Sequence, residues 1–382
     1  MLLIKGGEIH DGIKEKGFVA DILVEEGKIK RIAKSIKAPA GARVVDAKGL
    51  FIYPGFIDAH SHLGMDGYGI GYEGADYNEI NDIVSPQLRA IDGFKPMQPT
   101  LKSAALAGVT TVNTGPGSAN VLGGTFIAVK TVGHRVDDMI VKRETAMKCA
   151  FGENPKRVYR DKTDSSRMTT ASKLREMLFK AQEYMKKKET AGDDLSKQPA
   201  FDMKLEAMLP ILRGELALKA HAHATEDIFT AIRIAREFDV KITLEHVTEG
   251  HLIAEDLAKE DIPLAVGPSL THATKFELRN KTFATPGVLA KAGCQVSIIT
   301  DAPVIPQEYL ALCAALAVKS GMAPFQALQA ITINPARHCG IEDKVGSLEA
   351  GKDADILLFE EDPFLVASHP VKVFVLGEEV TE

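Results

Sequence analysis

The sequence has no tryptophan, and phenylalanine and tyrosine bring the aromatic share to only 6%. Single-stranded nucleic-acid binders and membrane-interface belts both depend on exposed aromatic side chains, so both are disfavoured. The 46 basic residues are outnumbered by 52 acidic ones, which leaves no basic excess for a phosphate backbone. Apolar runs such as 311–318 stop well short of the roughly eighteen residues that span a bilayer. We therefore expect neither a nucleic-acid nor a membrane partner.

Cysteine is also scarce. The four cysteines, at 149, 294, 313 and 339, form no CxxC motif and no close pair. A secreted disulfide framework would be denser, so reduced and mostly buried thiols are expected. The opening MLLIKGGEIHDG has no basic segment followed by an apolar stretch, as a signal peptide would. These features predict a cytoplasmic protein.

The order of the elements predicts an α/β protein. Short β-rich runs separated by turn residues occupy the first fifty residues and return near the end, whereas strands and helices alternate in between. Such alternation indicates parallel βαβ units, closed either as an open doubly wound sheet or as a barrel. No GxGxxG follows the first strand and no P-loop is present, and the length suits a barrel. We predict a (β/α)8 TIM-like barrel over residues 55–345. Residues 1–54 and 346–382 would form one small β-sandwich domain built from both termini.

Histidines and carboxylates recur where the expected strands end. His60 and His62 follow an apolar run, and residues i and i+2 of a strand face the same side. The HxH pattern returns once, and further strands end in a histidine or an acid. The additional residues are Glu153, His221, His223, His246 and Asp301. In a barrel these ends meet at the active-site mouth. Imidazoles mixed with carboxylates suit Zn²⁺ first, then Fe or Mn, so one or two divalent metals are the leading hypothesis.

Three segments carry a family resemblance. The motif PGFIDAHSHLG, residues 54–64, resembles the first-strand signature of the amidohydrolase superfamily of metal-dependent hydrolases. The N-terminal VEEGKIKRIAKSI, followed by VVDAKG, is similar to the small β-domain that precedes it. Residues 332–359 resemble the closing segment of that family. The similarity covers nearly the whole chain and looks closest to imidazolonepropionase-related and dipeptidase-like amidohydrolases.

The resemblance implies roles for individual residues. His60 and His62 would bind the more buried metal, and Asp301 would be shared between that metal and the catalytic water. His221 and His246 would bind a second metal, or would hold one metal and the substrate carbonyl in a mononuclear site.

The resemblance also implies a bridging ligand between two metals. Glu153, near the end of its strand, is the expected bridge, and Lys148, as a carboxylated lysine, is the alternative. His223 fits the ligand pattern less well than His221 and is expected to face the substrate. His272, on a later barrel loop, is a second candidate for contact with the substrate.

The implied activity is a metal-dependent hydrolysis of a C–N bond in a cyclic amide, an N-acyl compound or a dipeptide. Asp301 would act as general base and then as general acid. Two alternatives stay open. A mononuclear aminohydrolase could deaminate a heterocycle, with Glu226, three residues after His223, as its acid. A non-catalytic scaffold could keep only the fold, although the ligand residues are all present. The expected partner is a small-molecule substrate, and a homo-oligomer is compatible with the composition.

Overall fold

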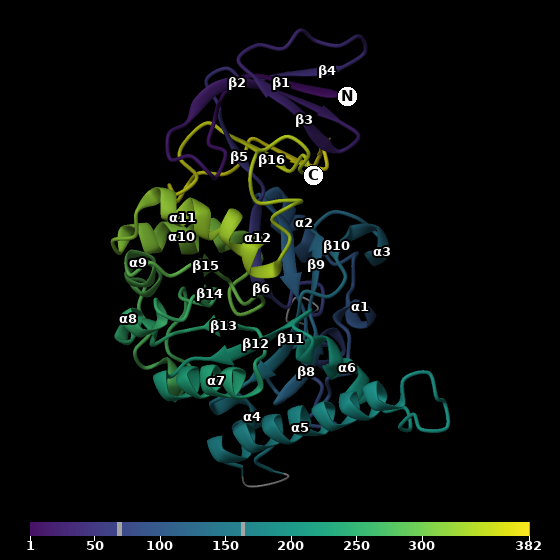
Figure 1. The fold of residues 1–382 in the computed structure, drawn as a ribbon. Coiled ribbons are helices and arrows are strands. Elements are labelled where there is room, and N and C mark those ends of the chain that lie inside the picture. Colours follow the sequence, from purple (N-terminus) through teal and green to yellow (C-terminus); the bar gives the residue numbers. More distant parts are fainter. Residues whose placement is uncertain (67–70, 162–164, 382) are drawn as a thin grey trace.

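The computed structural model describes residues 1–66, 71–161 and 165–381. Both ends of the chain enter one eight-stranded sheet in the order β18-β17-β16-β5-β1-β2-β3, with β4 paired to β1. Its strands are β1 (Leu2–Ile9), β2 (Phe18–Glu25), β3 (Lys28–Ala33), β4 (Arg43–Asp46), β5 (Phe51–Pro54), β16 (Ile356–Phe359), β17 (Lys372–Val375) and β18 (Glu378–Glu379). The antiparallel pairing of β5 with β16 joins the N-terminal and C-terminal segments. Figure 1 shows this sheet at one end of the molecule, with both termini beside it.

Two further sheets form the body of the molecule. Their orders are β10-β9-β7-β6 and β15-β14-β13-β12-β11-β8. The strands are β6 (Phe56–Ser61), β7 (Val109–Thr114), β8 (Leu122–Thr125), β9 (Ile127–Lys130), β10 (Ile140–Lys142), β11 (Ala146–Ala150), β12 (Ala217–Ala222), β13 (Ile242–His246), β14 (Leu264–Val266) and β15 (Val296–Ile298). Strands β6 and β7 are parallel, and so are β11 to β15. With helices outside them (Figure 1), these strands give a TIM-like α/β fold.

The strands depart from the expected ring of eight parallel strands. Strand β9 pairs with β7, and β8 pairs with β11, both antiparallel. Strand β9, which returns beside β7, follows it after residues 115–126, and this connection contains β8 but no helix. Without a crossover helix, the chain runs back antiparallel to β7.

The body therefore consists of two hydrogen-bonded sheets, and side chains join β6 to the segment after β15. The Asp58 carboxylate accepts hydrogen bonds from the Thr300 backbone N–H at 3.0 Å and from the Thr300 hydroxyl at 2.6 Å. It also accepts one from the Gln307 amide at 2.8 Å. Asp58 is fully buried. This seam holds the residues that follow β15 next to β6.

The helices cover the outside of these sheets. They are α1 (Ala90–Gly93), α2 (Pro99–Leu106), α3 (Val136–Met139), α4 (Glu153–Val158), α5 (Arg167–Ala191), α6 (Met203–Leu212), α7 (Thr225–Phe238), α8 (Ala254–Leu257), α9 (Thr285–Lys291), α10 (Leu310–Lys319), α11 (Pro324–Ala330) and α12 (Ile333–Cys339). Short 3₁₀ turns are η1 (Tyr72–Gly74), η2 (Gly250–Leu252), η3 (Phe276–Leu278) and η4 (Gln307–Tyr309). Helix α7 shows why they pack as they do. It buries Ile228, Ile232 and Ala235, which recur at helical spacing and lie in one core cluster with the strand residues.

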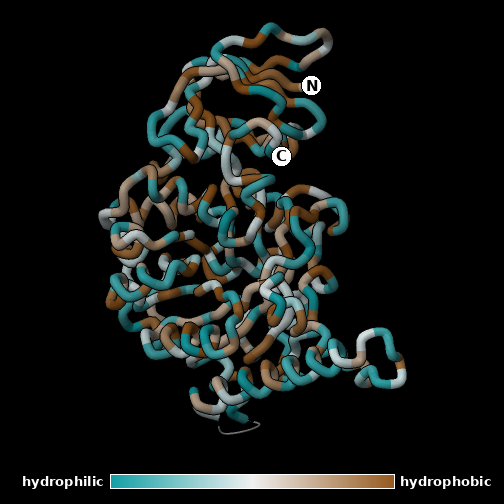
Figure 2. Tube along the Cα trace, viewed as in Figure 1, coloured by the Kyte–Doolittle hydropathy of each residue, from teal (hydrophilic) through white to brown (hydrophobic). Residues whose placement is uncertain are grey.

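Apolar residues concentrate in the strands, whereas the outer helix α5 is largely hydrophilic (Figure 2). All four cysteines are free thiols; three are buried and Cys294 is partly buried. Among the described residues, no helix combines the length and the apolar character needed to cross a membrane.

A buried lysine ties the body to the C-terminal segment. Lys130, at the end of β9, has its Nζ 2.7 Å from Asp355 Oδ2 and 2.9 Å from Asp353 Oδ2. The Thr110 hydroxyl also donates to Asp355. The ion pairs are almost fully buried. Removal of the lysine would leave carboxylates without their cation in a low-dielectric junction.

We therefore expect Lys130→Met to lower the free energy of unfolding by about 3–5 kcal/mol, the usual effect of breaking a buried pair on one side. Urea denaturation measures this. The matched control is Lys187→Met, because Lys187 pairs with Glu183 on the solvent-exposed side of α5. Exposed pairs contribute little, so the control should change stability by less than about 1 kcal/mol. Equal effects of the two substitutions would contradict this account of the junction.

Candidate metal centre

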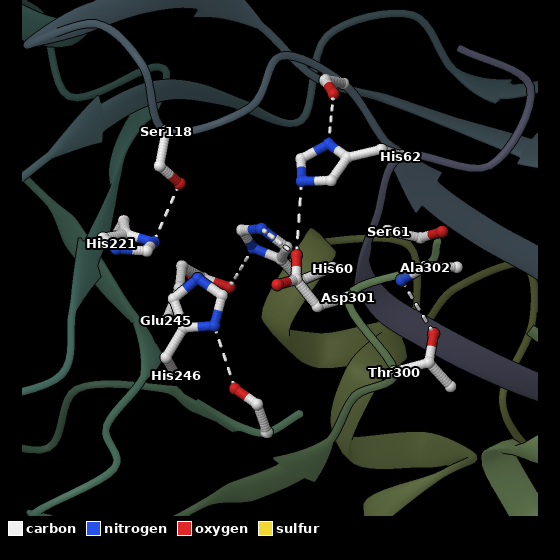
Figure 3. Close-up of polar contacts among 12 residues, drawn as sticks. His60, Ser61, His62, Ser118, His221, Glu245, His246, Thr300, Asp301 and Ala302 are labelled. Carbon is white, nitrogen blue, oxygen red and sulfur yellow. Dashed lines mark hydrogen bonds and ion pairs between the residues drawn. The ribbon is translucent and has the colours of Figure 1, made fainter. Parts of the chain in front are cut away.

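The first group of possible ligands comprises His60, His62 and Asp301, all close together (Figure 3). His60 lies in β6 and His62 directly follows it. Asp301 follows β15, whose continuation is bound to β6 through Asp58. Asp301 Oδ1 lies 3.2 Å from His62 Nε2 and 3.6 Å from His60 Nε2. Asp301 has a φ of 54°, in the left-handed region that non-glycine residues seldom adopt. Backbone strain of this kind concentrates at functional sites.

The second group comprises His221, His223 and His246. The parallel strands β12 and β13 are in register, with Ala222 opposite His246, so the three imidazoles emerge at the same edge. Their ring centroids lie 4.3–4.6 Å apart. One nitrogen from each ring lies within 4.8 Å of the others. Within each of the two groups, the donor atoms are close enough together to hold a metal ion.

In both groups the nitrogen facing away from the cavity is held by the protein. His62 Nδ1 donates to the Gly115 carbonyl at 2.6 Å, and His246 Nδ1 donates to the Gly267 carbonyl at 2.9 Å. His221 Nδ1 bonds the Ser118 hydroxyl at 2.8 Å, as Figure 3 shows. A carbonyl accepts only from an N–H, so in His62 and His246 the lone pair belongs to Nε2.

In the second group, two of the inward nitrogens have no hydrogen-bond partner in the described part of the protein. In the part of the chain that the structure describes, His221 Nε2 and His246 Nε2 are buried and make no hydrogen bond. An unpaired buried acceptor is costly, because it loses its hydration without a replacement. Metal-ligating histidines characteristically have one nitrogen held by the protein and the other directed at the ion. These residues therefore fit a divalent metal.

The charge states agree with this fit. Burial lowers the pKa of His60, His221 and His223 well below the ordinary value, and lowers that of His246 to about 4. The imidazoles are therefore neutral near pH 7, which is the form that binds metals. Burial alone would raise the pKa of Asp301, but His246 and His62 hold it below the usual range. The site combines neutral nitrogen donors with an ionised carboxylate.

Of the two candidates for a bridge, the structure brings Lys148 to the site. Lys148, on β11, is fully buried, and its Nζ lies 3.1 Å from His60 Nε2. Burial lowers the pKa of Lys148 to about 8. Glu153 belongs to neither ligand group, because β11 ends at Ala150 and the chain turns at Gly152 into α4. Its backbone N–H donates a hydrogen bond to Glu277 Oε2 at 2.9 Å.

The remaining candidates differ in position. His223 lies within the second ligand group and also lines a cavity at the site. His272 is exposed on the wall of a cavity of about 620 Å³ that also reaches His62, His221 and Asp301. The other wall residues include Tyr77, Asn78, Asn154, Arg157, Leu270, Lys275 and Val304. Glu226 is exposed in the first turn of α7 and does not line this cavity, so it is not placed as the acid of a deaminase.

A buried network beneath the site escaped the sequence analysis. Glu245 Oε2 accepts from His60 Nδ1 at 2.9 Å and from Lys219 Nζ at 2.7 Å. Glu245 Oε1 accepts from His338 Nε2 at 2.9 Å and from the Thr243 hydroxyl at 2.7 Å. Lys219 and His338 lower the pKa of Glu245 well below its usual range despite its burial. Glu245 thereby fixes the His60 ring. Charged residues inside otherwise apolar strands were the available signal.

The model of the amidohydrolase family matches residues 51–380. A solved structure of an amidohydrolase from Thermotoga maritima is 41% identical, covers 100% of both chains and has a TM-score of 0.96. The imidazolonepropionase of Thermoplasma volcanium is 28% identical over 94% of this chain and 89% of its own. Amidohydrolase tasK of Hapsidospora irregularis is 27% identical over 96% of this chain, which spans 40% of that relative.

The chain therefore belongs to the amidohydrolase family. This confirms the resemblance based on residues 54–64 and 332–359, both of which lie within the matched range. The expected class of enzyme, a hydrolase of carbon–nitrogen bonds, agrees with the family and with the names of these relatives.

The lowered imidazole pKa values predict a pH-dependent stability in the presence of chelator. As the pH falls below about 6.5, the histidines of the unfolded chain bind protons, whereas the buried imidazoles of the folded chain do not. Stability is therefore complete above that pH and is lost toward the folded-state pKa of about 4 for His246.

Urea midpoints at pH 7.5 and 5.5 measure the effect. His246→Asn should make the dependence shallower, whereas His134→Asn, at an exposed position, should leave it unchanged. Equal midpoints at the two pH values for the unsubstituted chain would contradict this reading of the site.

Proposed function

We propose that this chain is a metal-dependent hydrolase of a carbon–nitrogen bond in a small amide, such as a cyclic amide, an N-acyl compound or a dipeptide. One observation carries the proposal. Two groups of buried imidazoles, with Asp301, converge on one cavity, and their outward nitrogens are held by the protein. Burying so many polar groups is costly in free energy, and bound cations would offset that cost.

His60, His62 and Asp301 would hold one cation, and His221 with His246 would hold a second. Lys148 Nζ, next to His60, supports Lys148 over Glu153 as the carboxylated bridge. The nitrogen-rich donor set favours Zn²⁺ over Fe or Mn. A bound divalent cation supplies Lewis acidity and lowers the pKa of coordinated water from about 15.7 toward about 7.

Asp301 then moves the proton. Its carboxylate is ionised, faces the cavity and lies within hydrogen-bond distance of His62. In this position it takes a proton from the attacking water and returns it to the leaving amine. The cavity of about 620 Å³ is large enough for a small substrate. His272 on its wall would contact the substrate, and the apolar residues Leu270 and Val304 would exclude water from it.

Removal of metal should abolish hydrolysis, and its return should restore it. Chelated protein is assayed on N-acetyl amino acids, dipeptides and cyclic amides before and after addition of Zn²⁺ or Mn²⁺. Asp301→Asn should lower kcat by about 10²–10⁴-fold, the range for loss of a general acid–base group. Full activity in the chelated protein, or in the Asp301→Asn variant, would contradict the proposal.

Lys148→Ala and Glu153→Gln form a matched pair. Lys148→Ala removes the proposed bridge, so it should lower the metal content from two toward one equivalent and reduce activity at least tenfold. Glu153→Gln should change neither. Metal analysis and steady-state kinetics give the two readouts. The opposite ranking of the two variants would return the bridge to Glu153.

A further inference from the structure

The second ligand group contains one imidazole more than the two that the family resemblance implied. We propose that His223 is a ligand in its own right, so that His221, His223 and His246 form a three-imidazole site that holds a divalent cation without Lys148. The inference rests on the proposed metal dependence, but not on the hydrolysis of any substrate.

The geometry of the three rings carries this assignment. His223 and His246 are stacked at 24° with centroids 4.6 Å apart, and His221 stands nearly perpendicular to His223 at 4.6 Å. One nitrogen from each ring lies within 4.8 Å of the others. Tetrahedral Zn–N bonds of about 2.0–2.1 Å place ligand nitrogens about 3.3 Å apart. Small rotations of the rings therefore suffice to enclose one ion.

The ring of His223 is held in the same way as those of its neighbours. His223 Nδ1 bonds the buried Thr248 hydroxyl at 2.7 Å, which directs Nε2 toward the inside of the group. A residue that merely filled space would not need an oriented ring.

A buried carboxylate lies beside the three rings. Glu277 Oε1 is 3.8 Å from both His221 Nε2 and His223 Nε2. Its other oxygen accepts from the Glu153 backbone N–H, and Lys275 Nζ lies 2.6 Å from Oε1. A cation between the imidazoles would therefore lie beside a buried carboxylate that Lys275 already holds in an ion pair.

The alternative role for His223, contact with the substrate, would require the same nitrogen to face a substrate atom. His223 lines the cavity of about 620 Å³, so such an atom would approach it from that cavity, beside the neighbouring imidazoles and the Glu277 carboxylate. Nitrogen donors next to a carboxylate suit a cation better than they suit the oxygen of an amide substrate.

The test counts metal rather than turnover. In the double variant His60→Asn/His62→Asn, the first position is disabled, and after dialysis against Zn²⁺ we expect one equivalent to remain. X-ray absorption at the zinc edge should show three imidazoles. Lys148→Ala in that background should change neither value. Addition of His223→Asn should reduce the imidazole number to two and raise the Zn²⁺ dissociation constant at least tenfold.

His251→Asn is the matched control, because His251 Nδ1 likewise bonds a threonine hydroxyl, on Thr285, but lies outside the group. It should leave the metal content unchanged. Thr248→Val in the unsubstituted chain keeps the His223 ring but removes its hydrogen bond. This variant covers the case in which the double variant fails to fold. Loss of such an outer contact should weaken zinc binding by about 10–100-fold.

An unchanged imidazole number and dissociation constant after His223→Asn would overturn the inference. So would a Thr248→Val protein that binds zinc as the unsubstituted chain does. Zinc bound by three imidazoles in a protein that hydrolyses no amide would contradict the proposed function and leave this site standing. The two failures are therefore distinguishable.

Discussion

The site depends on the hydrogen bonds behind its imidazoles. A buried histidine has two nitrogens to satisfy, and His62 and His246 satisfy one each through a backbone carbonyl. His60 uses the Glu245 carboxylate in the same way. These contacts fix the orientation of each ring and direct its other nitrogen toward the inside of its ligand group. The inward nitrogens of His221 and His246 have no hydrogen-bond partner among the described residues, and a cation is the partner that we propose for them.

The fold delivers these rings to one place because parallel strands end at the same edge. Strands β11, β12 and β13 bring Lys148, His221 and His246 together through their register. His60 and His62 come from a different sheet, whereas Asp301 follows β15 of the same sheet as β11 to β13. The Asp58 carboxylate accepts hydrogen bonds from Thr300, and the His62 backbone N–H donates to the Ala302 carbonyl at 2.8 Å. These contacts hold Asp301 beside the β6 histidines.

Part of this was predictable from the sequence. The i, i+2 spacing of His60 and His62 and their place after an apolar run follow from the period of a strand, and the family assignment from residues 54–64 is confirmed. The position of Glu153 was not predictable in this way. A difference of one or two residues in where a strand ends decides which side chain faces the cavity, and β11 ends at Ala150, before Glu153. The antiparallel direction of β8 and β9 was also not predictable, because their sequences have the same β-rich pattern as a parallel strand. Glu245 and Lys219 neutralise each other through a contact between different strands, which no local sequence pattern predicts.

Anomalous X-ray diffraction from crystals of the protein loaded with zinc tests the central claim most directly, because it locates each ion independently of activity. The account predicts one peak among His60, His62 and Asp301 and a second among His221, His223 and His246. Zinc bound elsewhere on the surface, with no peak in either group, would contradict it.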